Sequence, residues 1–217
     1  MRRWVIVSLL VVIAAPCIYY SVVVVMARRK TPAIVAAALQ SEQMALGLED
    51  LAPRQLEILL RVQDPRFFEH SGVDLRTPGA GWTTITQGLV KIHYFDPFKP
   101  GIAKIKQSLI ARFAFDPLVS KEDQLRLFIN EAYLGNLEGD EVFGFSQGAR
   151  VYFGKTFAEL SEDEFIALVA MLIAPDTCNV RRQPELNAER ALRIRRLVAG
   201  ECAPKSWPDV WLKGCMY

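Results

Sequence analysis

The feature that most constrains this chain is an uncharged apolar stretch near its start. Trp4 to Met26 contains no Asp, Glu, Lys or Arg. At roughly 23 residues, it is long enough for a helix to cross a hydrocarbon core of about 30 Å. A cleaved signal peptide would have a shorter apolar core and a small-residue cleavage site. The pattern therefore predicts one uncleaved transmembrane helix, with basic residues at both ends: Arg2 and Arg3 before it, and Arg28, Arg29 and Lys30 after it.

Chain length and charge set broader limits. The chain has 217 residues, with 26 Lys and Arg against 24 Asp and Glu, for a formal net charge of +2. This length suits one domain plus an anchor. Because the charge is nearly balanced, nothing in the composition indicates nucleic-acid binding.

After the anchor, the chain has the pattern of a helical domain. Ser120 and Ser161 are each followed three residues later by an acidic residue, which predicts two capped helix starts. The glycine- and acid-rich segment 135–144 is expected to be a loop. Thr31-Pro32 is expected to open the first helix of the domain. We predict a mainly α fold in three parts: an anchor over residues 1–30, a domain over 31–200 and a tail over 201–217. The expected helices lie at 33–47, 53–62, 83–94, 104–115, 121–130, 162–173 and 188–198.

The most informative motif lies between Val62 and Gly72 and reads Val-Gln-Asp-Pro-Arg-Phe-Phe-Glu-His-Ser-Gly. It resembles the first motif of the peptidoglycan glycosyltransferases (glycosyltransferase family 51), which are the glycan-polymerising domains of penicillin-binding proteins and their monofunctional relatives. The family pattern there is Glu-Asp-x-x-Phe-x-x-His-x-Gly-x-Asp. This chain has Gln63 in place of the first Glu and matches the rest at Asp64, Phe67, His70, Gly72 and Asp74.

Four further segments match the family in order. Thr83 to Lys91 resembles Ser-Thr-Ile-Thr-Gln-Gln-Leu-x-Lys, with a glycine at the second Gln. Lys104 to Gln107 is similar to a basic run that ends in Glu. Lys121 to Asn130 is similar to Lys-x-x-Ile-Leu-x-x-Tyr-Leu-Asn, and Ala174-Pro175 begins the last segment, with Asn179 and Arg190 downstream. The resemblance covers roughly residues 55–200 and implies a lysozyme-like helical glycosyltransferase domain preceded by one transmembrane helix.

The resemblance also implies a chemistry. The family extends glycan strands from lipid II, a disaccharide-pentapeptide on undecaprenyl pyrophosphate. A sugar hydroxyl of the acceptor attacks the anomeric carbon of the growing chain, pyrophosphate leaves and the configuration inverts. Such a transfer needs a base at the attacking oxygen and charge stabilisation at the departing one. In the family, the first-motif Glu is the base and the third-motif Glu acts on the donor side; the resemblance allows a divalent metal, Mg²⁺ or Mn²⁺, and no other cofactor is expected.

Both catalytic positions hold amides in this chain. Gln63 stands at the first and Gln107 at the second, with Ser108 as the alternative if the alignment shifts by one residue. An amide cannot take up a proton near neutral pH, and losing general-base help typically slows a reaction by about 10²–10⁴-fold. We therefore expect a catalytically impaired member. The alternative is an active monofunctional transglycosylase with a displaced carboxylate, for which the sequence offers Glu69, Glu138, Asp140 and Glu141.

The residues aligned with the family's substrate-binding positions match the family pattern more closely than the two catalytic positions do. Gln87 and Lys91 are four apart and so share one helix face. Lysine ammonium groups suit a pyrophosphate. His70 is expected to be structural, and Trp82 is read either as narrowing the cleft or as a surface aromatic. The predicted substrate-binding residues are Asp64, Gln87, Lys91, Lys104 and Lys106.

The resemblance implies a single-pass protein of the bacterial cytoplasmic membrane, with its domain on the outer side. Its expected partners are lipid II or nascent glycan, the membrane and other cell-wall synthesis proteins. Disulfides persist on that side of the membrane. Cys202 and Cys215 bracket a tail containing Pro and Trp, and we favour their pairing over free thiols. With only 2 histidines and no Cys/His cluster of zinc spacing, no zinc site is expected.

Overall fold

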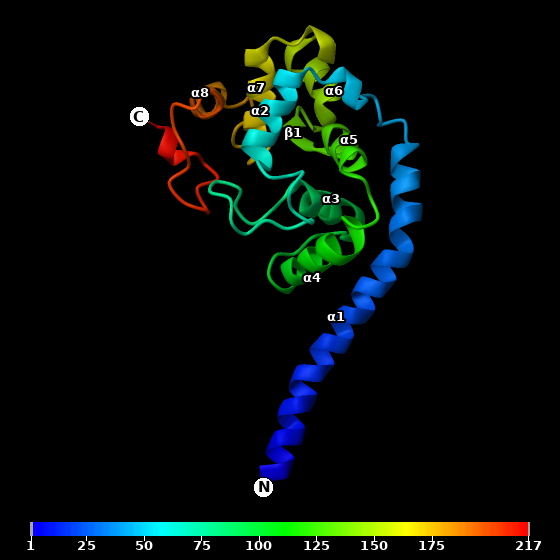
Figure 1. Ribbon diagram of the computed structural model, residues 1–217. Helices are drawn as coiled ribbons and strands as arrows, with labels where there is room; N and C mark the ends of the chain where they lie inside the picture. The colour runs from blue at the N-terminus through cyan, green and yellow to red at the C-terminus, as the bar shows by residue number, and fades with distance from the viewer. Residues whose placement is uncertain (1, 217) are drawn as a thin grey trace.

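The computed structural model describes residues 2–216, and within the first helix it describes the side chains of residue 12 and of residues 14 onward. The chain is mainly helical, as the sequence predicts (Figure 1). Its regular elements are α1 (Arg2–Leu39), α2 (Pro53–Gln63), α3 (Ile85–Tyr94), α4 (Ile102–Ile110), α5 (Lys121–Glu131), β1 (Tyr133–Leu137), β2 (Asp140–Phe143), α6 (Gly144–Gly148), α7 (Glu162–Met171) and α8 (Pro184–Val198). Wider π-helical turns extend α4 and α6, over Ala111–Phe115 and Ala149–Phe153.

The first helix is longer than predicted. Thr31-Pro32 does not open a new helix, because α1 continues through both residues and contains Pro16 and Pro32 in its interior. The buried Thr31 hydroxyl donates to the Ala27 carbonyl at 2.8 Å and shares a 2.6 Å hydrogen bond with the Tyr94 hydroxyl. Tertiary contacts therefore hold the helix together across Pro32, where local sequence favours a break. The boundary predicted between residues 30 and 31 falls inside one helix.

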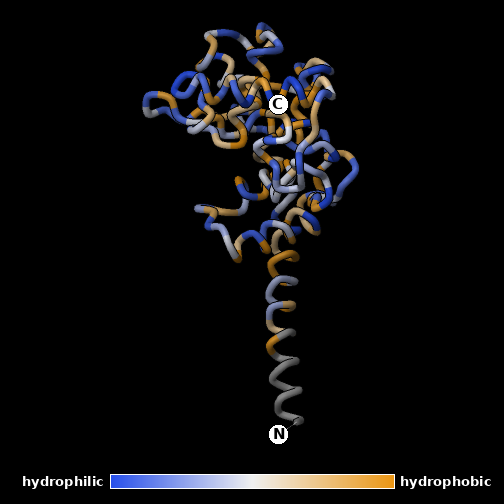
Figure 2. Tube along the Cα trace, turned by 90° about the vertical axis from the view of Figure 1, so that its left-hand side faces the viewer, coloured by the Kyte–Doolittle hydropathy of each residue, from blue (hydrophilic) through white to orange (hydrophobic). Residues whose placement is uncertain are grey.

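The N-terminal half of α1 extends away from the folded body (Figure 1), and the coloured part of this helix again leads away from the body in the view turned by 90° (Figure 2). Among the side chains that the structure describes, no helical segment is long and apolar enough to cross a membrane. Of the predicted span Trp4–Met26, residues 4–11 and residue 13 lie outside these described side chains.

The densest core surrounds α7. Residues 165–171 of this helix are all buried, and α7 packs against α8 and α2. The predicted capping box is present, since the Ser161 hydroxyl accepts from the Glu164 amide and the Glu164 carboxylate accepts from the Ser161 amide. Phe145 stacks on Phe165 with ring centroids 5.4 Å apart. This half of the molecule is a rigid support for one side of the cleft described below.

The segment 135–144 is not the loop that the sequence predicts. It lies in an antiparallel hairpin in which Tyr133 pairs with Phe143 and Leu137 with Asp140. The turn residues Glu138 and Gly139 both have positive φ, 57° and 104°, as a tight hairpin turn requires. A glutamate is an unusual residue for that conformation, so the sequence carries a weak turn signal. Burial of Leu134 and Val142 stabilises the short strands.

The C-terminal tail packs onto the domain. Cys202 and Cys215 form a disulfide, which confirms the pairing favoured from the sequence. The tail also meets the loop before α3, where the Gly79 amide donates to the Ser206 carbonyl at 3.1 Å and the Gly81 amide to the Trp207 carbonyl at 3.3 Å. The tail, α8 and this loop thereby form one continuous wall.

Candidate functional site

A cleft of about 450 Å³ opens between the α3 side of the molecule and the α7–α8 side. Its walls come from the end of α2, the loop before α3, one face of α3, the start of β1, the turn after α7, α8 and the tail. Residues far apart in sequence, from Val62 to Val210, therefore meet around one space. Apolar residues supply much of the wall, as is usual for ligand sites.

The charges of the cleft are of one sign. Among the described residues that line it, the charged ones are Lys91 and Arg190, and none is Asp or Glu. Gln63, Thr83, Thr84 and Tyr133 supply further polar groups. The cleft can therefore bind an anion and donate or accept hydrogen bonds, but its described wall offers no carboxylate to remove a proton.

Gln63 is the last residue of α2, and its half-buried side chain lines the cleft. The neighbouring Asp64 is fully buried. Its carboxylate lies 2.8 and 3.0 Å from His70 Nε2 and accepts from the Ile85 amide at 3.0 Å. Asp64, predicted to bind substrate, instead joins the end of α2 to the start of α3. It thereby fixes the backbone next to Gln63 from the buried side, away from the cleft. His70 has the structural role expected of it.

Gln87 of the second motif also lies behind the cleft. Its Oε1 accepts from the Thr84 amide at 3.0 Å, while the Thr84 hydroxyl accepts from the Gln87 amide at 3.1 Å. This reciprocal pair caps the N-terminus of α3. The Gln87 side chain is 2% exposed, and its Nε2 donates to the Ser108 hydroxyl at 2.8 Å. The structure therefore gives this predicted binding residue a capping role.

Gln107 does not reach the cleft, contrary to the expectation for a catalytic position. It is 1% exposed, and its Nε2 donates to the Gln87 carbonyl, which ties α4 to α3. Its Oε1 is buried and has no partner among the described atoms. Ser108, the alternative, donates to the Lys104 carbonyl at 2.9 Å and likewise lies away from the described cleft wall. The inner face of α4 turns toward α3, so both side chains become packing groups.

The predicted lysines separate into two settings. Lys91 is exposed and lines the cleft. Lys104 reaches the cleft rim, where its Nζ donates to the Thr83 hydroxyl at 2.9 Å. Burial, with a contribution from the nearby charge of Lys91, lowers the pKa of Lys104 to about 8. Lys106 instead places its Nζ 5.5 Å from the Phe95 ring centre.

The acids proposed as substitutes lie elsewhere. Glu69 is exposed and pairs with Arg66 at 2.7 Å. Glu138, Asp140 and Glu141 are exposed in the hairpin and are not among the described cleft residues.

A divalent metal does not fit the donor set of this cleft. Mg²⁺ and Mn²⁺ prefer oxygen ligands, carboxylates above all. Over the described part of the chain, no three His, Cys, Asp or Glu side chains gather to hold an ion. We derive no step through a metal.

The sequence left two readings open for Trp82 and gave no role to Arg190. Trp82 lines the cleft and is also 64% exposed, so its position agrees with both readings; its ring packs edge-on against Trp207 of the tail, with ring centroids 4.2 Å apart. Arg190 lies on the buried face of α8 with Asn187, Ala191 and Ile194. A charged residue at a helix position that the sequence pattern assigns to the buried face is unusual, and it could have marked Arg190 as a candidate functional residue.

Comparisons with known proteins agree with the geometry. A family model described as Transglycosylase matches residues 32–199. Penicillin-binding protein 1A of Escherichia coli (strain K12) is 28% identical over 178 residues, which cover 76% of this chain and 20% of that protein. Penicillin-binding protein 1B of the same strain is 31% identical over 156 residues, 66% of this chain and 18% of the relative. The chain thus spans about one fifth of the length of these relatives.

Proposed function

Because this chain belongs to the transglycosylase family, the peptidoglycan glycosyltransferases, we propose that it binds lipid II or nascent glycan without polymerising it. The observation that carries the proposal is the cleft wall, which has two cations and, among its described residues, no carboxylate. The fold and the family support the ligand class. The wall chemistry supports binding over turnover.

Gln63 is the residue that bears on turnover. An inverting glycosyl transfer needs a group that takes the proton of the attacking hydroxyl. Gln63 lines the cleft at the end of the helix where the family pattern has its Glu. Its amide can hold a sugar hydroxyl by a hydrogen bond, but it is not basic enough to accept that proton. Rate losses of about 10²–10⁴-fold are typical when such a base is missing.

The rim formed by α3 and α4 carries the groups that favour binding. The ammonium groups of Lys91 and Lys104 lie close enough for one charge to lower the pKa of the other residue, and Thr83 stands between the rim and the cleft. Two ammonium groups and a hydroxyl are suited to a pyrophosphate, which carries several oxyanions. This arrangement favours a pyrophosphate-linked sugar as the ligand.

The proposal includes the location. The uncharged stretch Trp4–Met26 and its basic flanks support a membrane anchor in the cytoplasmic membrane, with the domain on the outer side. The protruding N-terminal half of α1 is consistent with such an anchor (Figure 1). A lipid-linked substrate is found at the same surface, so the anchor would bring the cleft to its ligand. Alkaline extraction of membranes, followed by protease treatment from the outer side, tests this part.

The function is tested by two measurements on one preparation of the full chain in liposomes. Fluorescent lipid II is added with Mg²⁺ or Mn²⁺, and glycan ladders are sought on a gel beside a polymerising family member. Binding of the same lipid II is measured by fluorescence anisotropy. We expect binding without ladders. Ladders from this chain would establish the alternative of an active transglycosylase, and absence of both signals would contradict the whole proposal.

A further inference from the structure

Arg190 is a buried cation for which the structure describes no ion pair; Asp209 acts on its charge without a hydrogen bond to it. Its side chain is 3% exposed, yet it lines the cleft. Nε and Nη1 are buried without a partner, and the guanidinium makes no hydrogen bond or ion pair with any described residue. Burial lowers the pKa of Arg190 to about 10, which leaves it charged at neutral pH. Burying an unpaired charge is strongly unfavourable, so an unpaired arginine at a cleft wall points to a partner that arrives from outside.

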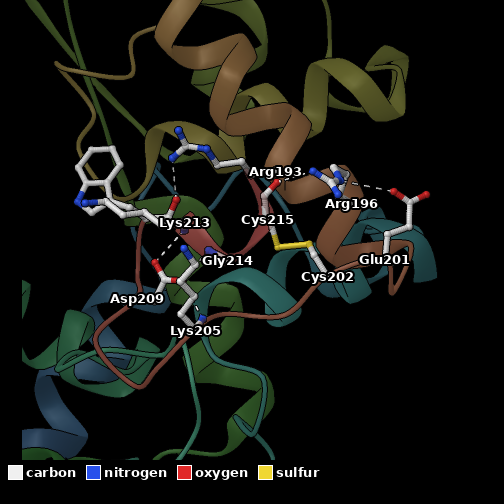
Figure 3. Close-up of a disulfide and its surroundings, with 10 residues drawn as sticks. Arg193, Arg196, Glu201, Cys202, Lys205, Asp209, Lys213, Gly214 and Cys215 are labelled. Atoms are coloured by element: carbon white, nitrogen blue, oxygen red, sulfur yellow. Dashed lines mark hydrogen bonds and ion pairs between the residues drawn. A yellow bond between two sulfur atoms is a disulfide. The ribbon is translucent and has the colours of Figure 1, made fainter. Parts of the chain in front are cut away.

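The neighbouring groups make their hydrogen bonds elsewhere, and none that the structure describes is made to the Arg190 guanidinium. The Asp209 carboxylate accepts from the amides of Lys205, Lys213 and Gly214 at 2.8 to 3.0 Å (Figure 3). Burial raises the pKa of the Cys178 thiol, which therefore stays neutral. The Trp211 ring centre lies 5.7 Å from the guanidinium carbon. A ring face attracts the cation but leaves its N–H edge without an acceptor.

The tail builds this corner of the cleft. Val210 lines the cleft beside Arg190, and Trp211 contacts the guanidinium. The Cys202–Cys215 disulfide closes the tail on itself, and a 3.0 Å hydrogen bond from Arg196 to the Cys215 carbonyl joins the tail to α8 (Figure 3). Arg193 donates to the Trp211 carbonyl at 3.0 Å. These tail residues come after the matched residues 32–199, whereas Arg190 lies within them, so the family model covers only one side of this corner.

We propose that Arg190, enclosed by the tail, is the anion-binding residue of a second subsite at the α8–tail end of the cleft, and that it takes a carboxylate or phosphate group of the ligand. A guanidinium presents a planar fork of donors that matches both groups in two parallel hydrogen bonds. The identity of the ligand rests on the proposed function. Under it, the group is either a carboxylate of the stem peptide or a phosphate of the lipid-linked pyrophosphate.

The test compares wild type with Arg190→Gln and Arg190→Lys, with Arg195→Gln as the matched control. Arg195 lies on the same helix but is exposed and pairs with Asp163. The probes are a short-chain lipid II, the same molecule with its peptide carboxylates amidated, and inorganic pyrophosphate. We expect Arg190→Gln to bind short-chain lipid II roughly 10- to 100-fold more weakly, the range for losing hydrogen bonds to a charged group. Arg190→Lys should retain part of the affinity, and Arg195→Gln all of it.

The probes separate the two sources of the anion. If Arg190 takes a carboxylate, amidation weakens binding to wild type and leaves binding to Arg190→Gln unchanged. If it takes a phosphate, Arg190→Gln weakens binding of all three probes. Equal binding of lipid II by wild type and Arg190→Gln overturns the subsite while leaving the proposed function standing. Failure of wild type to bind any probe contradicts both.

The melting temperature of the ligand-free proteins distinguishes a ligand-binding role of Arg190 from a structural one. An unpaired buried cation is unfavourable, so Arg190→Gln should melt at or above the wild-type temperature in the absence of ligand. Saturating short-chain lipid II should then raise the melting temperature of wild type more than that of the variant. An Arg190→Gln protein that is unfolded or melts markedly lower would show that Arg190 is a structural residue, and it would overturn the proposal.

Discussion

The two ends of the cleft hold positive charge in opposite environments. At the α3–α4 end, Lys91 is exposed and Lys104 donates to the Thr83 hydroxyl. At the α8–tail end, Arg190 is buried, and the structure describes no hydrogen-bond partner for it. Water can solvate a charge at the first end before any ligand arrives. At the second end, the Arg190 guanidinium is already shielded from water, so an arriving anion could accept hydrogen bonds from N–H groups that have no described partner.

The comparison separates binding from chemistry. Lys91, Arg190 and the neutral Gln63 all line the same cleft. Cations draw an anionic ligand in, but a proton acceptor is needed to convert it. Under the proposed function, the cations serve recognition, and the amide of Gln63 stands where the family resemblance expects the base. The tail and Lys91 variants below address the two ends separately, and the Gln107 and Gly88 variants address the helices α4 and α3.

The largest expected effect comes from the tail. Replacing Cys202 and Cys215 by Ala should lower the free energy of unfolding by about 2–4 kcal/mol, because the bond restrains a short loop in the unfolded chain. Urea unfolding monitored by tryptophan fluorescence measures it. The loosened tail should weaken the Arg190 subsite and leave pyrophosphate binding at the α3–α4 end intact. Cys17→Ala, at an exposed free cysteine, is the control. Equal weakening at both ends would show that the ends are not independent.

The next largest effect is expected at Gln107. Gln107→Glu replaces a donor to the Gln87 carbonyl by an acid, and it should lower stability by about 1–3 kcal/mol at neutral pH. Burial disfavours the ionised form, so the folded-state pKa of the new acid lies above its unfolded value of about 4.3. The variant should therefore be least impaired below that value and lose stability as pH rises through the folded pKa. Denaturant curves across pH measure this, with the exposed Gln40→Glu as control. A loss that does not vary with pH would contradict the buried setting of Gln107.

A smaller effect concerns the α3–α4 end alone. The pKa of Lys104 is about 8, lowered by burial and by Lys91. Affinity for inorganic pyrophosphate should fall by at most about fivefold as pH rises through that value, the scale of one partly exposed ion pair. Lys91→Gln should move the fall to higher pH. Because the folded pKa lies below the unfolded value, Lys104 makes stability increase with pH above 8. A flat profile between pH 7 and 9 would rule out Lys104 as the titrating group.

The smallest effect lies at Gly88, in the interior of α3 on the cleft wall. An added Cβ there meets nothing within 4 Å. Gly88→Ala should therefore raise stability by about 0.5–1 kcal/mol through helix propensity and leave ligand binding at both ends unchanged. Gly144→Ala is the contrasting variant, because Gly144 has φ +72° and its Cβ would collide with the Asn130 carbonyl. Thermal unfolding of the two variants should move in opposite directions, and a destabilised Gly88→Ala would contradict the open space described.

Much of the fold was predictable because local signals agreed with tertiary packing. The Ser161 capping box and the start of α2 at Pro53 lie where the sequence places them. The predicted helix start at Thr31-Pro32 was wrong. A proline favours a break, but packing of α1 against α4 and the Thr31–Tyr94 contact keep the helix continuous. The hairpin was missed because its strands are short and its turn places a glutamate at positive φ. Such features depend on contacts that no local pattern records.

The sequence located some of the residues that line the candidate site, but it could not tell which way their side chains point. The motifs located Gln63 and Lys91, which line the cleft. They could not tell that Asp64, Gln87 and Gln107 turn inward, because a match in sequence does not state which way a side chain points. The tail side of the site lies beyond the matched residues, so neither Val210 nor Trp211 carried a family signal. The motifs named Arg190 without a role, and only the three-dimensional structure shows that it is buried at the cleft with unmet hydrogen bonds.

The most direct test of the central claim is the rate of lipid II consumption by wild type and Gln63→Glu, measured side by side in liposomes, with Gln40→Glu as the charge-matched control. We expect no consumption above the protein-free rate for wild type and for the control. We expect measurable polymer for Gln63→Glu, at least about 10²-fold above the wild-type limit, because a carboxylate would then line the cleft. Wild-type protein that consumes lipid II as fast as Gln63→Glu would contradict the claim that the cleft lacks its base.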